Sequence, residues 1–520
     1  MKQKSTFLTF LFFLSFFMVS GTNYYCDPVN GNLSNDGLSV DTPWPSLQQV
    51  VSSKSFAGGD TLFLLSGNHG APSISKKNTS DVIITRYQDE KPLLNKIAFY
   101  GASHWVITHV DISSQGTRLP FDPPLEHPVY PVFGNSLVLI RSQSSFITLD
   151  HCNIYSIEDA SEWTKDDWNY KSWNGVYSVE NSDVTLRHCH IKNTNFSIHN
   201  ANSVTNNLYE YNVVENFNGD ALRADGKNTV IQYNIVKNSY KTNGNHDDMV
   251  QAFKNQNPVI LRGNLFISHS DPDQPFQGSC QGIGFFDGFY HGFIIENNVV
   301  ATNHWHGITL LGAKDCKVVN NTVVDLNTTD SMVPWIMIDK HKDGTPSSGC
   351  LIRNNITPKI TKDADVVSDH NWIITHTQYS RYFVNVGEQD YRPTQDSPAV
   401  DKGSAEDTPA VDLVGTPRPQ GKAHDIGAYE FLESSSFHRM NAAPDYNPTF
   451  YPNPITSTLH FEFPYACSGR IRIADISGNI VLEKDISALS GSLDLSEKKS
   501  GIYFLQIDSN QPSVHKIIKL

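Results

Sequence analysis

The chain has 520 residues and a formal net charge of −14 at pH 7, with 39% hydrophobic and 11% aromatic residues. This length and this hydrophobic content fit a folded protein with one long core and a further small domain, and they exclude a disordered chain. The negative charge argues against a nucleic-acid partner. It also means that an anionic polysaccharide would have to be held by local Arg or Lys residues or through a bound cation.

The first 21 residues are typical of a cleaved export signal. Positive charge in MKQK precedes the apolar run TFLTFLFFLSFFMV and the small residues Ser20 and Gly21. The apolar run is too short for a comfortable membrane span. We therefore expect an exported mature chain that begins near residue 22 and has no transmembrane span.

Residues 23–69 combine a turn rich in Asn, Asp and Gly with a helical stretch, SLQQVV, and a first strand, TLFLLSG. We expect this helix to cap the open end of a stack of strands. Two insertions follow, a proline-rich stretch at 114–135 and a second one at 156–174. The second carries Trp163, Trp168 and Trp173, which form either a platform for stacking sugars or the packing between this loop and the body.

A short apolar strand followed by asparagine recurs along residues 207–325. The repeats read LYEYNVVEN, VIQYNIVKN, VILRGNLFIS, FIIENNVVAT and KVVNNTVVD. Their aligned asparagines, 22 to 34 residues apart, are Asn212, Asn234, Asn264, Asn298 and Asn321. The same frame reaches Asn355 forwards, and Cys189 and Cys152 backwards, which predicts that these cysteines are buried thiols. A repeat of this length with period-2 alternation predicts a solenoid of strands. An inward Asn at one position of every coil can donate and accept along the stack.

On these repeats the chain resembles the right-handed parallel β-helix superfamily, over roughly residues 23–430. That superfamily includes pectate, alginate and chondroitin lyases, polygalacturonases, carrageenases and mannuronan epimerases. The resemblance implies an all-β fold and an extracellular polysaccharide as partner, but a shared fold does not fix the reaction. The sequence lacks the characteristic motifs of the chondroitinase-B-like lyases, the polygalacturonases and the epimerases, so no catalytic residue is transferred by match.

The C-terminal part contains two further recognisable segments. SPAVDKG, DLVGTPR and DIGAYEF, between 397 and 431, are similar to the closing segment of many secreted bacterial β-helix proteins. YPNP, the turn DISG, LDL, GIYF and a Lys-rich last strand resemble the C-terminal sorting domain of the type IX secretion system of Bacteroidetes. This resemblance implies a small β-sandwich, a secretion machinery as partner, and a secreted or cell-surface location. The predicted domains are a signal peptide at 1–21, a catalytic β-helix at 22–432, a linker at 433–447 and a sorting domain at 448–520.

The spacing of the asparagines predicts which polar residues share a face. Subtracting 34 from Gln281 gives Asp247, and adding 23 gives His304, so these three residues are expected in one row, within one residue. The neighbouring rows would then hold Asp248, Gly282 and Trp305, followed by Met249, Ile283 and His306. The preceding coil adds Asp220, Arg223 and Asp225. With coils about 4.8 Å apart, the side chains form a lateral patch about 15 Å long, which suits several sugar units.

This patch contains the residue types that sugar chemistry needs. The candidate catalytic residues are His246, Asp247, Asp248, His304, His306 and Arg223, and the candidate substrate-binding residues are Asp220, Asp225, Gln251, Gln281, Asp287 and Trp305. β-Elimination on a uronic acid requires a neutralised carboxylate, a base for the C5 proton and an acid for the leaving oxygen. Asp247 and Asp248 are candidates to hold a calcium ion, the only cofactor that we expect, and Arg223 is a candidate to bind the carboxylate. Any of the three histidines is a candidate base.

Four functions fit this pattern. The leading prediction is a lyase acting on a uronate-containing glycan. A glycoside hydrolase would use two carboxylates from the same patch, and a C5-epimerase would use the lyase groups but return a proton to the other face. A non-catalytic glycan-binding protein is the fourth alternative, although a binding surface would be richer in aromatic residues than this histidine-bearing patch. We expect a monomer in every case.

Overall fold

The computed structural model describes most of the chain. The described residues are 21–432 apart from 123–132, 202, 254–255, 328 and 330, and then 449–451, 455, 457–462, 469–475, 480–486, 490–508 and 513–519. The predicted signal peptide, apart from Gly21, and the predicted linker lie outside these residues, so both remain predictions.

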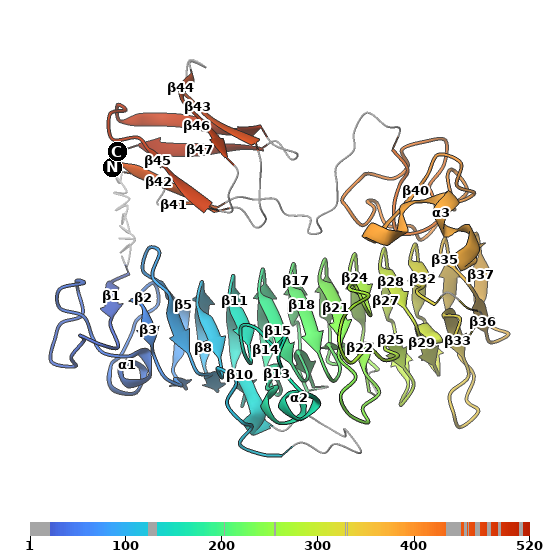
Figure 1. Cartoon of the computed structure of the whole chain (residues 1–520), viewed down its shortest axis with the longest axis horizontal. Coiled ribbons are helices and arrows are strands. Elements are labelled where there is room, and N and C mark those ends of the chain that lie inside the picture. Colours follow the sequence, from blue (N-terminus) through green and yellow to red (C-terminus); the bar gives the residue numbers. More distant parts are fainter. Residues whose placement is uncertain are drawn as a thin grey trace, which may run out of the picture.

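The main body is a parallel β-helix, in which each coil adds one short strand to each of three parallel sheets (Figure 1). Sheet A contains β1 (Asn23–Cys26), β2 (Thr61–Leu64), β5 (Lys77–Arg86), β8 (Ser103–Thr108), β11 (Ser145–Asp150), β14 (Ser182–Arg187), β17 (Leu208–Glu210), β20 (Thr229–Gln232), β23 (Val259–Arg262), β27 (Ile294–Glu296), β31 (Lys317–Val319), β34 (Leu351–Arg353) and β37 (Val367–Asp369). Sheet B contains β3 (Gly67–Asn68), β6 (Pro92–Leu94), β9 (Asp111–Ser113), β12 (Asn153–Tyr155), β15 (His190–Thr194), β18 (Val213–Phe217), β21 (Ile235–Ser239), β24 (Leu265–Ile267), β28 (Val299–Thr302), β32 (Thr322–Asp325), β35 (Ile356–Thr357) and β38 (Trp372–Ile373). Sheet C contains β4 (Ser73–Ile74), β7 (Ile97–Tyr100), β10 (Ser136–Arg141), β13 (Asn174–Ser178), β16 (Ile198–Asn200), β19 (Leu222–Arg223), β22 (Asp248–Gln251), β25 (Gln281–Phe285), β29 (His306–Leu311), β33 (Trp335–Asp339) and β36 (Ile360–Lys362).

The core is a stack of inward apolar residues, one row for each strand position. On sheet C, for example, Val250 of β22 is paired with Ile283 of β25, and Ile283 is paired with Ile308 of β29. All three are fully buried. Each coil buries its inward face only against the neighbouring coils. The regular alternation of apolar and polar residues in the sequence therefore builds one continuous core.

The predicted asparagine ladder lies at the corner between sheets A and B. Asn264 donates from Nδ2 to Asn298 Oδ1 of the next coil (2.9 Å) and to Ile231 O (2.9 Å), and its own Oδ1 accepts from Asn234 Nδ2 (3.0 Å). Each buried amide is therefore satisfied by its neighbours along the stack. Cys152 and Cys189 are buried as predicted.

The N-terminal end of the β-helix is capped as predicted. Helix α1 (Leu47–Ser53) covers the first coils and buries Leu47 and Val50 in the main core. The apolar end of the stack is thereby protected from water and from pairing with another strand edge.

The tryptophan-bearing insertion is a packed structure. Helix α2 (Lys165–Lys171) begins at Thr164, which forms a capping box with Asp167. Trp163 and Trp168 are buried in a small cluster with the part-buried Tyr240 and Phe276, and Trp173 is buried in the main core. Of the two alternatives for these tryptophans, the structure has the packing role, and the sugar-stacking platform is wrong.

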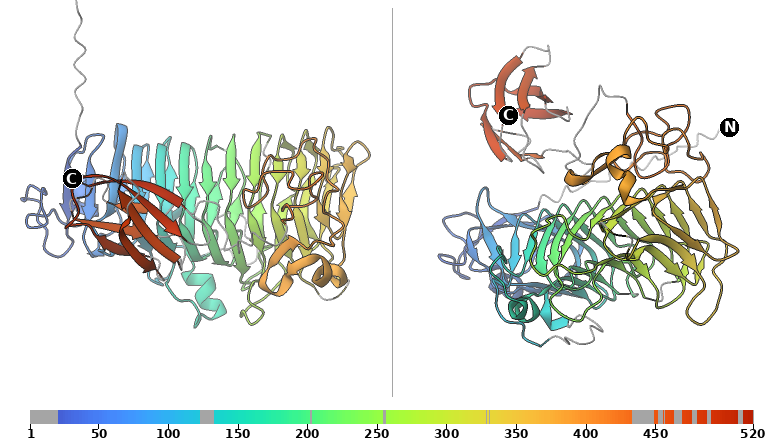
Figure 2. Two further views of the ribbon diagram at one scale, coloured as in Figure 1. Left: turned by 90° about the horizontal axis from the view of Figure 1, so that it is seen from above. Right: turned by 45° about the vertical axis from the view of Figure 1, so that its right-hand side comes forward.

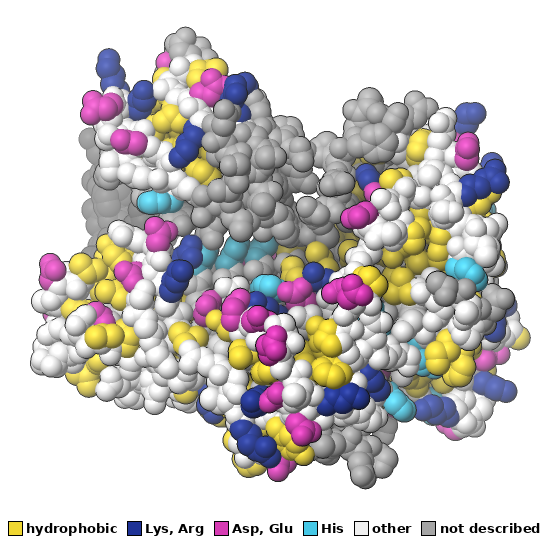
Figure 3. Space-filling model, viewed as in Figure 1, with side chains coloured by type: hydrophobic (Ala, Val, Ile, Leu, Met, Phe, Trp, Pro, Cys, Tyr) yellow, Lys and Arg dark blue, Asp and Glu magenta, His cyan; other side chains and the backbone are white. Residues whose placement is uncertain are grey.

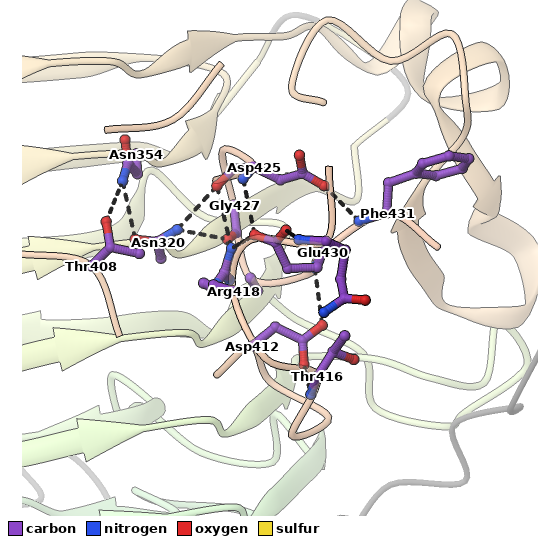
Figure 4. Close-up of polar contacts among 12 residues, drawn as sticks. Asn320, Asn354, Thr408, Asp412, Thr416, Arg418, Asp425, Gly427, Glu430 and Phe431 are labelled. Atoms are coloured by element: carbon purple, nitrogen blue, oxygen red, sulfur yellow. Dashed lines mark hydrogen bonds and ion pairs between the residues drawn. The ribbon is translucent and has the colours of Figure 1, made fainter. Parts of the chain in front are cut away.

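The closing segment, residues 374–431, packs on the outer face of sheet B near the C-terminal coils (Figures 1 and 2). It contains α3 (Tyr379–Tyr382) and the antiparallel pair β39 (Phe383–Asn385) and β40 (Asp390–Pro393). Arg418 is the centre of its polar contacts (Figure 4). It donates to Glu430 Oε1 (2.7 Å), to Gly427 O (2.9 Å) and to Asn297 Oδ1 of the β-helix (3.1 Å).

The C-terminal domain is the predicted β-sandwich. One antiparallel sheet contains β41 (Thr449–Tyr451), β42 (Thr458–Glu462) and β45 (Ser490–Asp494), and the other contains β44 (Ile480–Ile486), β43 (Gly469–Asp475), β46 (Gly501–Asp508) and β47 (Ser513–Lys519). Residues of both sheets form one separate apolar core. No helix in the described part of the chain is both long enough and apolar enough to cross a membrane.

Candidate active site

Four polar residues lie on successive coils where the chain enters sheet C. Asp248 opens β22, Gln281 opens β25 and His306 opens β29, and Asp248 is paired directly with Gln281. Asp220 precedes β19, and its Oδ1 accepts a hydrogen bond from the backbone N–H of Asp248 (3.2 Å). We call Asp220, Asp248, Gln281 and His306 the polar row.

The polar row corrects the alignment made from the asparagine spacing. That alignment, made to within one residue, placed Asp247 and His304 beside Gln281. The register has Asp248 opposite Gln281, which is within that margin, but it places His306, two residues beyond His304, in the same row. The register also places Val250, not Met249, opposite Ile283. The asparagines mark the corner between sheets A and B, whereas these side chains follow the corner between sheets B and C. Loops of different length at that second corner shift the count.

The carboxyl group of Asp248 is the most unusual feature of the polar row. It is fully buried, and neither of its oxygens forms a hydrogen bond with any residue that the structure describes. The missing side chain of Gly284 makes room for it, because a Cβ at that position would lie 2.5 Å from Asp248 Oδ1 and 2.5 Å from the ring of Phe286. Burial and the nearby charge of Asp220 raise the pKa of Asp248 well above its usual value.

Asp220 is tied to Arg223. Its Oδ2 accepts from Nε (2.9 Å) and Nη2 (2.7 Å) of Arg223, whose guanidinium lies 4.1 Å from the ring centroid of Phe253. Both oxygens of Asp220 are thus occupied, because Oδ1 accepts from the Asp248 backbone. Arg223 Nη1 is buried and has no partner among the described residues.

Asp247 lies beside a different group of residues from its neighbour. Its Oδ2 accepts from Ser239 Oγ (3.0 Å), and its Oδ1 is 3.9 Å from Lys241 Nζ. Burial raises the pKa of Asp247 to about 7. The two consecutive aspartates therefore share no hydrogen-bond partner among the described residues, and each has at least one buried oxygen that no described residue donates to.

The three candidate histidines differ in their surroundings. His246 is exposed and forms no hydrogen bond with the residues that the structure describes. His304 Nδ1 accepts from the backbone N–H of His306 (3.1 Å), and His306 Nδ1 is 3.1 Å from Thr309 Oγ1. Burial lowers the pKa of His304 and of His306 to about 4, so both imidazoles are neutral at pH 7.

The remaining candidates surround the polar row. Trp305 is 45% exposed, and its ring is nearly parallel to Trp335 (9°, centroids 6.4 Å apart). Gln251 is part-buried and paired with Arg223. Asp225 is buried, accepts from the Phe253 backbone N–H (2.9 Å) and has its pKa raised to about 7 by burial.

Asp287, the last candidate, is exposed, unlike the buried carboxylates, and its charge contributes to the raised pKa of Asp248. It forms an ion pair with Lys342 (2.7 Å).

Figure 3 shows acidic and basic side chains interspersed over the face that it displays. On a chain of net charge −14, recognition of an acidic sugar therefore depends on individual groups at the site.

His199, which the sequence pattern did not single out, lies on the same outer face. Its ring is buried and stacked on Tyr177 (centroids 4.5 Å apart), and Nδ1 has no partner among the described residues. Burial and the charge of Arg223 lower its pKa well below the usual value. The repeat spacing contained a signal for it, because Cys189 and Asn212 are 23 residues apart and the same step back from Arg223 ends one residue from His199.

Several buried oxygens of the site accept no hydrogen bond from the described residues. Among the described residues, no hydrogen bond reaches Asp247 Oδ1, either carboxylate oxygen of Asp248, or Gln281 Oε1. Carboxylate and amide oxygens are the ligands that Ca²⁺ prefers, so these side-chain oxygens fit a calcium site. In the described part of the chain, no three His, Cys, Asp or Glu side chains gather closely enough to hold a metal by themselves. A calcium ion would therefore need Gln281, backbone, water or substrate oxygens as further ligands.

Comparisons with known proteins agree with this architecture. Residues 77–323 match the family model of the right-handed beta helix region, and residues 449–520 match that of the secretion system C-terminal sorting domain. The sequence matches no curated protein.

Three solved structures are similar to the chain at low identity. The pectate lyase Pel9A is 14% identical with a TM-score of 0.46, over 79% of this chain and 96% of that one. A lacto-N-biosidase from Eubacterium ramulus is 13% identical with a TM-score of 0.39, over 68% of each chain. A rhamnogalacturonan lyase is 12% identical with a TM-score of 0.35, over 70% of this chain and 91% of that one. The chain is a right-handed parallel β-helix protein whose C-terminal sorting domain directs it by type IX secretion to the cell surface or the medium.

Proposed function

We propose that this protein is an enzyme that cleaves a uronate-containing polysaccharide by β-elimination at the polar row. The observation that carries the proposal is the buried, unpartnered carboxyl group of Asp248, which lies in the same row as the neutral His306. Burying such a group without partners is costly, and active sites are where such costs are found. In the reaction, a base removes the C5 proton, its electron pair forms the C4–C5 double bond, the C4–O bond breaks, and the leaving oxygen takes up a proton.

His246 is the base in this proposal. It is the exposed member of the three histidines, whereas His304 and His306 have Nδ1 engaged. A histidine ring without fixed partners can turn either nitrogen toward the substrate. Arg223 supplies positive charge next to the row.

Asp248 has one role in the calcium-free site and another when calcium is bound. With its pKa raised, it carries a proton that the leaving oxygen can take. With calcium bound, Asp247 and Asp248 would hold the ion together with Gln281. The ion would then neutralise the carboxylate of the substrate.

A screen on acidic polysaccharides tests the function. The mature chain is incubated with pectin, alginate, ulvan, carrageenan and chondroitin, and ultraviolet absorbance of unsaturated uronate is recorded together with reducing ends. We expect both signals to rise together on at least one uronate polymer, and we expect a chelator to reduce them at least about tenfold, with recovery on adding Ca²⁺. Reducing ends that rise without absorbance would contradict elimination.

A hydrolase is the second candidate, and one observation favours it. Burial raises the pKa of both Asp248 and Asp220, but only Asp220 is held by Arg223, so two neighbouring carboxyls have different surroundings, as acid–base hydrolysis needs. It is less well supported than elimination, because both oxygens of Asp220 are already engaged. Proton exchange at C5 without cleavage would indicate an epimerase, and affinity without any product would indicate a glycan-binding protein.

Gly284→Ala is expected to reduce activity at least about tenfold without unfolding the protein. The added Cβ would lie 2.5 Å from Asp248 Oδ1, and a shift of about 1 Å in a reacting group can cost up to about 100-fold. The matched control is Gly387→Ala, where the nearest atom would be an ordinary 3.5 Å away. Kinetics and thermal unfolding of both variants check this. Full activity of a folded Gly284→Ala protein would show that the position of Asp248 is unimportant.

A further inference from the structure

His306 belongs to a chain of three hydrogen-bonding groups. The indole Nε1–H of Trp335 donates to Thr309 Oγ1 (2.9 Å), and Thr309 Oγ1 is 3.1 Å from His306 Nδ1. Thr309 is fully buried, and its hydroxyl has no other hydrogen-bond partner among the residues that the structure describes. The position of the histidine proton can therefore be deduced from the hydrogens that these groups possess.

The indole nitrogen is only a donor, so Thr309 must accept from it. The threonine hydroxyl has a single hydrogen, and His306 Nδ1 is the one acceptor within reach in the described structure. If Nδ1 carried the proton, that hydroxyl hydrogen would be buried without an acceptor. Such a loss is large enough to shift the ratio of the two tautomers by roughly tenfold or more. Thr309 thus donates to Nδ1, and the proton of neutral His306 is on Nε2.

His304 is held in the same tautomer by a different donor. The backbone N–H of His306 points at His304 Nδ1 (3.1 Å), so this nitrogen must be unprotonated. The two rings are neighbours, with centroids 5.0 Å apart, and both remain neutral at pH 7 because burial lowers their pKa values to about 4. Both rings are only part-buried. Both rings therefore carry their proton on Nε2. Each Nε2 can donate a hydrogen bond, and neither can act as a base.

We propose that His304 and His306 act as neutral hydrogen-bond donors to the carboxylate of the uronate, and that Thr309 and Trp335 are positioning residues that fix His306 in its donor tautomer. This inference rests on the proposed elimination reaction. When the base removes the C5 proton, negative charge moves into the adjacent carboxylate, where these N–H groups receive it. Donors of this kind, held ready before the reaction, contribute roughly 10²–10³-fold to the rate. The substrate group recognised at this end of the polar row is therefore a carboxylate.

The first test is a direct measurement of the tautomers. The full mature chain is prepared with ¹⁵N-labelled histidine, and the His306 signals are identified among the 20 histidines as those missing from His306→Gln. We expect wild type to show a protonated Nε2 and an unprotonated Nδ1. Thr309→Val, which removes the hydroxyl and keeps the shape, should show a mixture of tautomers, and Thr309→Ser should restore the wild-type spectrum. A proton on Nδ1 in wild type would overturn the inference.

The second test separates a donor from a base by activity. Gln can donate a hydrogen bond but cannot accept the C5 proton, so His306→Gln should retain activity within about tenfold of wild type, whereas His306→Ala should lose roughly 10²-fold or more. Thr309→Val should lower kcat about tenfold more than it changes KM, with rescue by Thr309→Ser. Equal inactivity of His306→Gln and His306→Ala on a cleaved substrate would overturn the donor role. Failure of the elimination reaction itself would appear separately, as a lack of unsaturated product from wild type, and the ¹⁵N spectra would still decide the tautomer.

Discussion

Asp248→Asn is expected to reduce product formation by at least about 10³-fold and to make the protein more resistant to heat at pH 8. The loss of activity follows because an amide can neither give up a proton nor bind calcium as a carboxylate does. The gain in stability follows because wild type must either bury a charge or hold a proton at a pH where the unfolded chain has none. Initial rates, together with thermal unfolding at pH 8 and pH 4, measure both effects.

The pH dependence of that gain has a definite sign. The pKa of Asp248 in the folded protein is well above that of an aspartate in the unfolded chain. The stability that its proton contributes is therefore complete below the unfolded pKa and is lost as pH rises through the folded pKa. The advantage of Asn should therefore be seen at pH 8 and be absent at pH 4. Asp89→Asn, at an exposed turn far along the chain, is the control and should change neither property. Wild-type activity in a folded Asp248→Asn protein would remove Asp248 from the mechanism.

Arg418→Met is expected to lower the free energy of unfolding by about 3–5 kcal/mol, the usual loss when one partner of a buried ion pair is removed. The side chains of Arg418 and Glu430 are both completely buried, and the substitution would leave Glu430 charged without its partner (Figure 4). It would also remove the bond to Gly427 within the closing segment and the bond to Asn297 that joins this segment to the β-helix. Denaturant unfolding followed by tryptophan fluorescence measures the change.

Arg187→Met is the matched control for Arg418. It removes an ion pair with Asp150 (2.9 Å), but the Arg187 side chain is 45% exposed, so the expected loss is about 1 kcal/mol or less. Equal effects of the two substitutions would contradict the account of how the closing segment is held.

The repeat architecture was predictable because one physical requirement recurs in every coil. Asn234, Asn264 and Asn298 occupy the same buried corner, and each can be satisfied only by the coil next to it. Strict spacing is therefore visible in the sequence. The sorting domain was predictable for another reason, because its strands carry characteristic short sequence motifs.

The alignment within the site was less predictable because it depends on loops that obey no repeat. The loop before β22 brings Asp248, not Asp247, opposite Gln281. The space that accepts the Asp248 carboxyl depends on Gly284, which a sequence alone does not connect with it. His199 was not predicted because it lies on the coil before Asp220 and Arg223, the first residues compared by spacing. The tautomer of His306 depends on Trp335 and Thr309, whose contact with it requires the folded coils.

The most direct test of the elimination reaction is the mass of the smallest product released by the mature chain from a defined uronate oligosaccharide. Elimination breaks the C4–O bond without adding water, so the product from the new non-reducing end should be lighter by one water than the corresponding hydrolysis product. We predict that lighter mass, and we predict that it disappears in Asp248→Asn. A product that carries the added water would contradict elimination and would favour hydrolysis by the carboxyl pair.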